Sequence, residues 1–201
     1  MYEINEFKEH KITINKSDFI ALVYPIKSKD DILICLKDAK IKYPKATHYC
    51  YAATLGDKRE WATYQDNGEP KGTAGPPILD VLDHYSLTNI LCIVIRYYGG
   101  IKLGAGGLIR AYSNATSKLL EQLLLFEKKE VFTYDLIFPY QFIHQVESIL
   151  HDQATIIDKT FLENVCFHIS ILTDDLTFLD EIKHVIKTIK KENAYIYQPI
   201  K

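Results

Sequence analysis

Long hydrophobic runs are missing from this sequence of 201 residues. The longest run that matters, residues 90–95, is far shorter than the roughly 20 apolar residues that a membrane-spanning helix needs. The N-terminus is polar and acidic, and it lacks the apolar segment of a secretory signal peptide. We therefore expect a cytoplasmic protein without a membrane partner.

Cysteine is scarce and scattered. Cys35, Cys50, Cys92 and Cys166 form no CxxC pair, and all four lie in apolar segments. Disulfide frameworks and zinc sites place their cysteines at short, regular spacings, so the sequence favours neither. His48 lies two residues before Cys50, but no second ligand pair at metal spacing follows it, and we expect His48 to hydrogen-bond at a strand end. The pattern predicts buried, reduced thiols, no metal site and no cofactor.

An excess of charge of one sign is also absent. The formal net charge is −2. Residues 1–130 contain 18 lysines and arginines against 16 acidic residues, whereas residues 131–201 contain 6 against 10. Non-specific DNA binding depends on many cations that neutralise phosphates, so DNA is not expected as a partner. A local basic patch is still compatible with these counts.

The common catalytic motifs are missing too. The sequence has no GxSxG, no HExxH and no Ser/His/Asp order, and it lacks the spacing of a P-loop or of a dinucleotide-binding loop. Its hydrophobic content of 47% and charged content of 25% are those of an ordinary globular protein. No catalytic residue is assigned.

Glycine, in contrast, is concentrated in two stretches. Of the nine glycines, all but Gly56 lie in residues 65–77 or residues 96–112, which we name the first and the second glycine loop. Glycine costs conformational entropy on folding, so this density indicates tight turns or a close backbone approach. Each loop precedes a predicted helix, whose free N–H groups and dipole favour an anion. Four cations lie on or beside the loops: Lys71, Arg96, Lys102 and Arg110.

The two loops carry a longer paired pattern. The first contains GEPKGTAG (68–75) and the second reads RYYGGIKLGAGGLIRAY (96–112). These motifs resemble the IMPACT family, in its bacterial YigZ-like branch, and the likeness runs from about Ser17 to about Glu121. Asn67 stands where the pattern commonly has a second aspartate, and Lys71 where it commonly has serine, so an adjacent carboxylate pair is missing here.

The resemblance implies an α+β protein with two domains. The N-terminal domain, residues 1–128, would have the left-handed βαβ fold shared by a small-subunit ribosomal protein and domain IV of elongation factor G. The C-terminal domain, residues 131–201, would be ferredoxin-like, as domain V of that factor is. Eukaryotic relatives are linked to the regulation of translation through a stress-kinase pathway.

Periodicity along the chain predicts the individual elements. Before a boundary at residues 127–130 we expect strands at 17–27, 48–54, 60–64 and 90–95, and helices at 28–43, 76–85 and 108–123. Beyond it we expect strand 131–138, helix 140–151, strands 154–161 and 165–172, helix 174–190 and strand 194–198. This βαββαβ order is that of the split βαβ arrangement.

We expect one binding site formed by both loops. Its residues are Asp66, Glu69, Lys71, Thr73, Arg96, Gly99, Gly100, Lys102, Gly104, Gly106, Gly107 and Arg110. The loops are predicted to lie side by side, so that Glu69, Thr73, Arg96, Lys102 and Arg110 surround one groove.

Several roles stay open at these positions. The second loop is either a cradle for a phosphate or carboxylate or a turn packed against the sheet. Asp66 and Glu69 either ligate a divalent metal, act as an acid/base pair, cap helix N–H groups, or pair with Arg96. Three tyrosines beside Arg96 either stack on RNA bases or form the rim of the core: Tyr97, Tyr98 and Tyr112.

The favoured function is a non-enzymatic binding protein linked to translation. Its partner would be RNA, the ribosome or a translation-associated protein, bound through the two glycine loops. One alternative is a protein–protein regulator without RNA contact. Another is an enzyme that acts on a small phosphorylated or carboxylated substrate and uses the same loops as its pocket.

Overall fold

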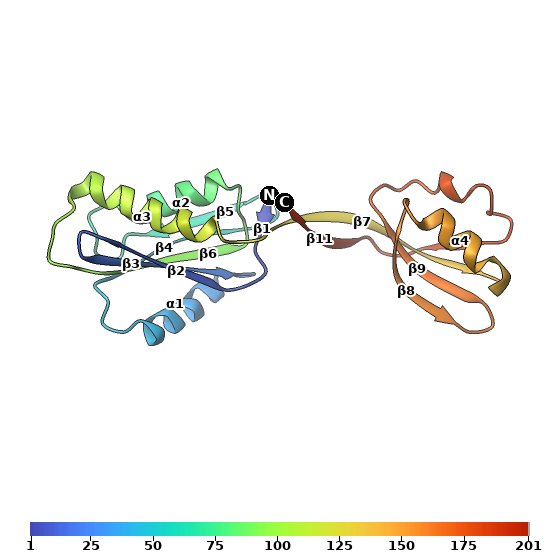
Figure 1. Ribbon diagram of the computed structural model, residues 1–201, viewed down its shortest axis with the longest axis horizontal. Helices are drawn as coiled ribbons and strands as arrows, with labels where there is room; N and C mark the ends of the chain where they lie inside the picture. The colour runs from blue at the N-terminus through green and yellow to red at the C-terminus, as the bar shows by residue number, and fades with distance from the viewer. Residues whose placement is uncertain (201) are drawn as a thin grey trace. The chain divides into compact units, whose positions relative to one another are not determined.

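The computed structural model describes residues 1–200. The chain divides into two compact units, visible in Figure 1. The N-terminal unit contains residues 1–127 together with the end of the last strand from Pro199, and the C-terminal unit contains residues 128–198. Each unit has its own sheet and its own buried core.

The sheet of the N-terminal unit has five antiparallel strands in the order β2-β3-β6-β4-β5. Their bounds are Lys8–Ile14, Ser17–Pro25, Ile90–Tyr97, His48–Leu55 and Trp61–Gln65. The predicted strands and the hairpin of β4 and β5 are confirmed, whereas β2 was not predicted. The central strand β6 is buried on both faces, which explains its continuous apolar run.

Helices cover both faces of this sheet (Figure 1). Helix α1 (Asp30–Lys42) lies on one face, and helices α2 (Gly75–His84) and α3 (Gly104–Leu120) lie on the other. Neighbouring residues of β6 alternate between the two cores: Cys92 packs with α2 and α3, and Ile93 packs on the side of α1. All three predicted helices are confirmed. Helix α3 begins earlier than expected, so the last three glycines of the second loop are already helical.

The strand β7 (Leu125–Phe138) is longer than the sequence indicated. Residues 127–130, where a boundary was expected, lie inside this strand, and the division between the compact units falls there as well. Strand β1 (Tyr2–Glu3) pairs with the first part of β7, at Phe126 and Glu127.

The C-terminal unit builds its sheet around β7. Strand β9 (Val165–Ile171) lies between β7 and β8 (Thr155–Phe161), and β10 (Lys187–Lys190) and β11 (Ala194–Ile200) also pair with β7. A short 3-10 turn, η1 (Tyr140–Phe142), leads into helix α4 (Ile143–Leu150). Phe138 and Phe167 meet edge to face in the core, with ring centroids 5.0 Å apart.

The helix predicted for residues 174–190 is wrong. The structure has a single 3-10 turn, η2 (Thr177–Leu179), then further turns, and then strand β10. Leu179, Ile182 and Ile186, which recur at helical spacing in this segment, are buried in the core although the segment is not helical. The physical reason is tertiary: residues 187–190 pair with the free edge of β7, at Tyr134 to Ile137, and this pairing overrides the local helical pattern.

The cysteines agree with the expectation in part. All four are free, and Cys50 and Cys92 are buried, but Cys35 and Cys166 are only half-buried. Among residues 1–200, no helix is long and apolar enough to cross a membrane.

Candidate functional site

Strand directions bring the two glycine loops to the same end of the five-stranded sheet. Strands β5 and β6 are each antiparallel to β4, which lies between them, so they run in the same direction. The first loop leaves the end of β5 at Gln65 and enters α2, and the second leaves the end of β6 at Tyr97 and enters α3. His48, the first residue of β4, lies opposite Arg96 in this register.

Asp66 caps the start of helix α2. Its Oδ1 accepts the N–H groups of Ala74 (3.0 Å) and Gly75 (2.9 Å), and its Oδ2 accepts that of Gly72 (2.8 Å). Burial alone would raise the pKa of Asp66, but the three backbone hydrogen bonds outweigh it and lower the pKa. Of the roles left open for Asp66, the structure therefore shows the capping of helix N–H groups.

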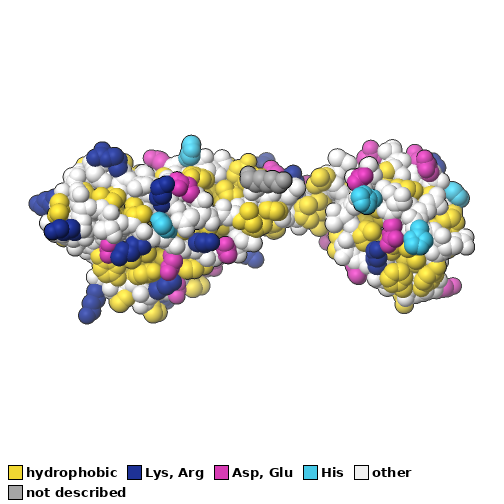
Figure 2. Space-filling model, viewed as in Figure 1, with side chains coloured by type: hydrophobic (Ala, Val, Ile, Leu, Met, Phe, Trp, Pro, Cys, Tyr) yellow, Lys and Arg dark blue, Asp and Glu magenta, His cyan; other side chains and the backbone are white. Residues whose placement is uncertain are grey.

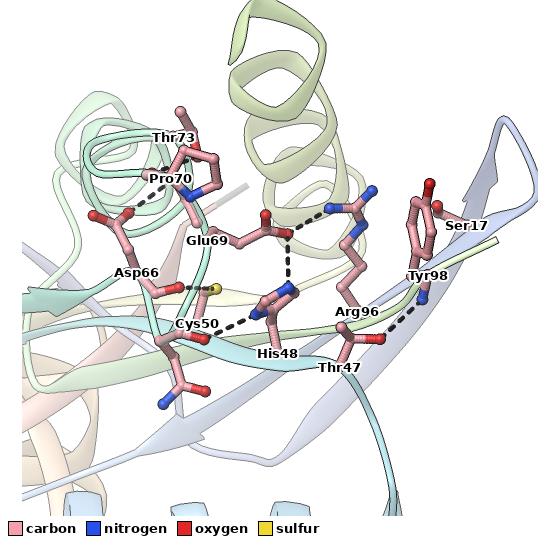
Figure 3. A network of polar contacts seen from close by, with 12 residues as sticks. Ser17, Thr47, His48, Cys50, Asp66, Glu69, Pro70, Thr73, Arg96 and Tyr98 are labelled. Atoms are coloured by element: carbon pink, nitrogen blue, oxygen red, sulfur yellow. Dashed lines mark hydrogen bonds and ion pairs between the residues drawn. The ribbon is translucent and has the colours of Figure 1, made fainter. Parts of the chain in front are cut away.

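Glu69 occupies the centre of a buried polar network (Figure 3). Its Oε1 accepts a hydrogen bond from Arg96 Nη1 at 2.7 Å and another from the Tyr112 hydroxyl at 2.8 Å. The side chains of Glu69 and Arg96 are only 3% and 6% exposed. Glu69 thus pairs with Arg96, which was another of the open roles.

Cys50 and Tyr112 complete this network in their neutral forms. The Cys50 thiol donates to the backbone carbonyl of Asp66 at 2.8 Å and lies 3.4 Å from the Tyr112 hydroxyl. Burial raises the pKa of Cys50 to about 12, and burial together with Cys50 and Glu69 raises the pKa of Tyr112 well above its usual value. The Tyr112 hydroxyl is therefore a hydrogen-bond donor within the core. Because its side chain is fully buried, the ring is not accessible for stacking on RNA bases.

His48 hydrogen-bonds at a strand end, as predicted. Its Nδ1 lies 2.9 Å from the carbonyl oxygen of Asn67. A carbonyl only accepts, so Nδ1 carries the proton. The Asn67 side chain in turn accepts the N–H of Tyr49 at 3.1 Å, and these two bonds fasten the first loop to the start of β4. The other ring nitrogen, Nε2, lies 3.9 Å from Glu69 Oε1.

A cavity of about 410 Å³ opens between the two loops. Its polar wall is formed by His48, Glu69, Arg96 and Lys102, and the first residues of helix α3 close one side. Pro70, Leu103 and Leu108 supply an apolar wall, and Tyr98, a residue that is 46% exposed, also lines the cavity. The volume falls within the range of small-ligand pockets, about 300–1,000 Å³.

The structure brings only part of the expected groove together. Glu69, Arg96 and Lys102 line this cavity with Gly104, whereas Thr73 does not: it is buried, and its hydroxyl donates to the Pro70 carbonyl at 2.7 Å. Arg110 and Gly107 line a second cavity, which also includes Asn15 and Asn114.

The remaining expected residues have other places. Lys71 is exposed, and Gly72 gives its N–H to Asp66. Gly99 allows a close approach of two backbones, because a Cβ there would lie 2.0 Å from the backbone of Lys16. Gly100 adopts a positive φ of 83° in the loop, and Gly106 lies in the first turn of α3.

Sequence reasoning missed much of the cavity wall. Thr47, Pro70, Leu103, Ala105 and Leu108 were not among the expected site residues, and His48 was expected only to hydrogen-bond. The sequence holds little signal for them, because His48 and Thr47 reach the site only through the register of β4 with β6. Leu103 and Ala105 flank expected residues of the second loop, which is the one local clue.

The positive charge of this site is modest. Arg96 is neutralised by Glu69, so Lys102 is the exposed cation of the cavity wall. Among residues 1–200, no side chain caps the start of helix α3, and its first N–H groups add the positive end of the helix dipole. On the face that Figure 2 shows, the lysines and arginines of the N-terminal unit are spread among acidic side chains. The arrangement therefore suits a local contact with one anionic group.

Comparison with known proteins gives consistent similarities. The family model described as the Impact N-terminal domain matches residues 15–120. The chain is 34% identical to "IMPACT family member YvyE" of Bacillus subtilis over 167 residues, which is 83% of this chain and 77% of that protein. It is 34% identical to "IMPACT family member YigZ" of Escherichia coli over 139 residues, which is 68% of each. A crystal structure of a hypothetical protein matches 95% of this chain and 97% of its own, with a TM-score of 0.62 and 26% identity.

Proposed function

This chain belongs to the IMPACT family, among its bacterial YigZ- and YvyE-like members, and on that premise we propose that it is a non-enzymatic binding protein linked to translation. It acts in the cytoplasm and contacts RNA or the ribosome through its two glycine loops. The translational role comes from the family, whose eukaryotic members are linked to the regulation of translation.

One observation carries the binding role. Two loops that are separate in the sequence meet at one end of a sheet, and the second loop contains the start of helix α3 with Lys102 beside it. Helix starts with free N–H groups bind phosphate groups readily. Lys102 and Arg110 are exposed, whereas Arg96 is held by Glu69, so the first two supply the charge for phosphate contacts.

The domain relationships form part of the same proposal. We infer that the N-terminal domain has the left-handed βαβ fold of a small-subunit ribosomal protein and of elongation factor G domain IV. We also infer a ferredoxin-like relationship for the C-terminal domain. The strand order β10-β7-β9-β8 supports this, whereas the second helix of the βαββαβ order is replaced by η2 and turns.

The geometry gives less support to an enzyme. Both oxygens of Asp66 accept backbone hydrogen bonds, and Glu69 Oε1 is held by Arg96 and Tyr112. A general acid or base needs a proton-transfer route to substrate, and these carboxylates are engaged in structural contacts instead.

The test is the salt dependence of binding to single-stranded RNA and to ribosomes. Lys102→Ala and Arg110→Ala should each reduce the slope of log K against log salt by about 0.7 for single strands. Lys37→Ala, an exposed lysine of α1 on the other face of the sheet, is the matched control and should leave the slope unchanged. Identical slopes in all four proteins would count against phosphate contact and favour the regulator that binds only protein.

A further inference from the structure

Arg96 has more hydrogen-bond donors than partners. Its Nη1 donates to Glu69, but its Nε has no acceptor among the described residues, although the side chain is only 6% exposed. Buried polar atoms in folded proteins nearly always have a partner. Arg96 lies in the wall of the cavity between the loops and gives a donor of Nη1 to Glu69, so a ligand with acceptor oxygens there would meet the remaining guanidinium donors on that wall.

The start of helix α3 also presents N–H donors that need acceptor oxygens. Gly104 and Ala105 line the cavity, and no side chain in the described part of the chain caps their helix. The first N–H groups of a helix have no partner within it. Acceptor oxygens placed here would therefore meet two independent sets of donors, one from β6 and one from α3.

The net positive charge of the cavity wall favours a ligand with a single negative charge. Glu69 cancels the charge of Arg96, which leaves Lys102 and the helix dipole, worth about half an elementary charge. A phosphodiester carries one negative charge, whereas a phosphate monoester carries about 1.5 to 2 at pH 7. The diester matches the cavity better.

The remaining wall fits a planar, largely apolar group. The ring of Tyr98 is half-exposed, its centroid lies 5.4 Å from the Arg96 guanidinium carbon, and Pro70, Leu103 and Leu108 lie nearby. Tyrosine rings at such positions stack on nucleobases. We propose that this cavity binds one nucleoside phosphodiester unit, with its phosphate at the start of α3 and its base against Tyr98.

This inference rests on the proposed function in using the same loops, but it names a single nucleotide unit as the ligand. Two sources offer that chemistry: a single-stranded RNA chain and a cyclic mononucleotide. The probes are therefore hexaadenylate RNA, 3′,5′-cyclic AMP and adenosine, each titrated calorimetrically into the chain of 201 residues. Adenosine carries the base without the phosphate and should bind at least ten-fold more weakly than cyclic AMP.

The first pair of variants tests the phosphate. Ala105→Glu puts a carboxylate into the cavity at the start of α3, where the helix dipole favours it, so the fold is kept while an anion is repelled. Ala105→Gln has nearly the same size without the charge. We expect at least a ten-fold loss of affinity for cyclic AMP and RNA in Ala105→Glu, with less than three-fold in Ala105→Gln. Equal affinities would overturn the inference.

The second pair tests the base. Tyr98→Ala should weaken both nucleotide probes by about 5- to 150-fold, the effect of losing one stacked base. Tyr64→Ala removes a tyrosine of nearly equal exposure, 47% against 46%, on strand β5 and should leave affinity unchanged. A loss in Tyr64→Ala that matched Tyr98→Ala would contradict specific stacking.

Different outcomes would contradict the proposed translational role and the proposed nucleotide cavity. If RNA binds and neither cavity variant changes its affinity, the loop-binding role survives and the cavity inference is wrong. If cyclic AMP binds and the cavity variants abolish it while RNA and ribosomes do not bind, the cavity inference stands and the translational role falls. Adenosine binding as tightly as cyclic AMP, or no binding of any probe at millimolar concentration, would also overturn the inference.

Discussion

Glu69 Oε1 and Arg96 Nη1 lie 2.7 Å apart, and both side chains are almost entirely removed from solvent. The pair joins the first glycine loop to the central strand of the sheet, two segments 27 positions apart in the sequence. It fixes the wall of the cavity and also cancels the charge of its most deeply buried cation. Stability and ligand choice therefore depend on the same contact.

Glu69→Gln should destabilise the N-terminal unit by about 3–5 kcal/mol, because it leaves the buried charge of Arg96 without its partner. The measurement is urea unfolding followed by a probe of this unit. Asp80→Asn, at an exposed position of α2, is the control and should stay within about 0.5 kcal/mol of wild type. A loss below about 1 kcal/mol in Glu69→Gln would show that the pair is not needed to offset that charge.

Asp66→Asn should weaken the start of α2 in a pH-dependent way. The pKa of Asp66 is lowered in the folded state, so its contribution to stability is fully present above the unfolded value of about 3.9 and is lost as the pH falls through the folded pKa. We expect a deficit of about 1–2 kcal/mol at pH 7 that shrinks towards zero in acid. Urea midpoints measured from pH 7 to pH 2.5 check this. A deficit that is constant with pH would contradict it.

Replacing two glycines of the second loop by alanine should change the stability of the protein in opposite directions. Gly99→Ala places a Cβ 2.0 Å from the backbone of Lys16, so a backbone must move, at a cost of about 2 kcal/mol or more. Gly106→Ala, in the first turn of α3, meets no atom closer than 3.5 Å and should stabilise by up to about 1 kcal/mol. Thermal unfolding of both variants provides the comparison, and shifts of the same sign would be the contrary result.

The C-terminal unit should fold alone when residues 128–198 are expressed without the rest. It has its own buried core, built from β7, β9, α4 and the turns after η2. A cooperative thermal transition is expected, and Phe167→Ala should lower its midpoint strongly or abolish it, because Phe167 is fully buried. Absence of a cooperative transition in the unmodified fragment would contradict its independence.

Local signals in the sequence were enough to predict most elements of the N-terminal unit. The apolar run at residues 90–95 gave the buried strand β6, and the spacing of Leu108, Ala111, Ala115 and Leu119 gave the buried face of α3. Glycine density marked both loops, since tight turns and close backbone approach restrict the residue type at the position itself.

Which side chains contact one another, in contrast, followed from the packing of distant segments. Asp66 caps a helix while Glu69 holds a buried arginine, although both carboxylates lie in the same short loop. Strand order and register made that choice, because they bring β4 and β6 beside this loop. The residues expected to form a second C-terminal helix instead end in β10, since the edge of β7 offers them backbone hydrogen bonds. Local periodicity reports which side chains are buried, whereas pairing between distant segments decides what they touch.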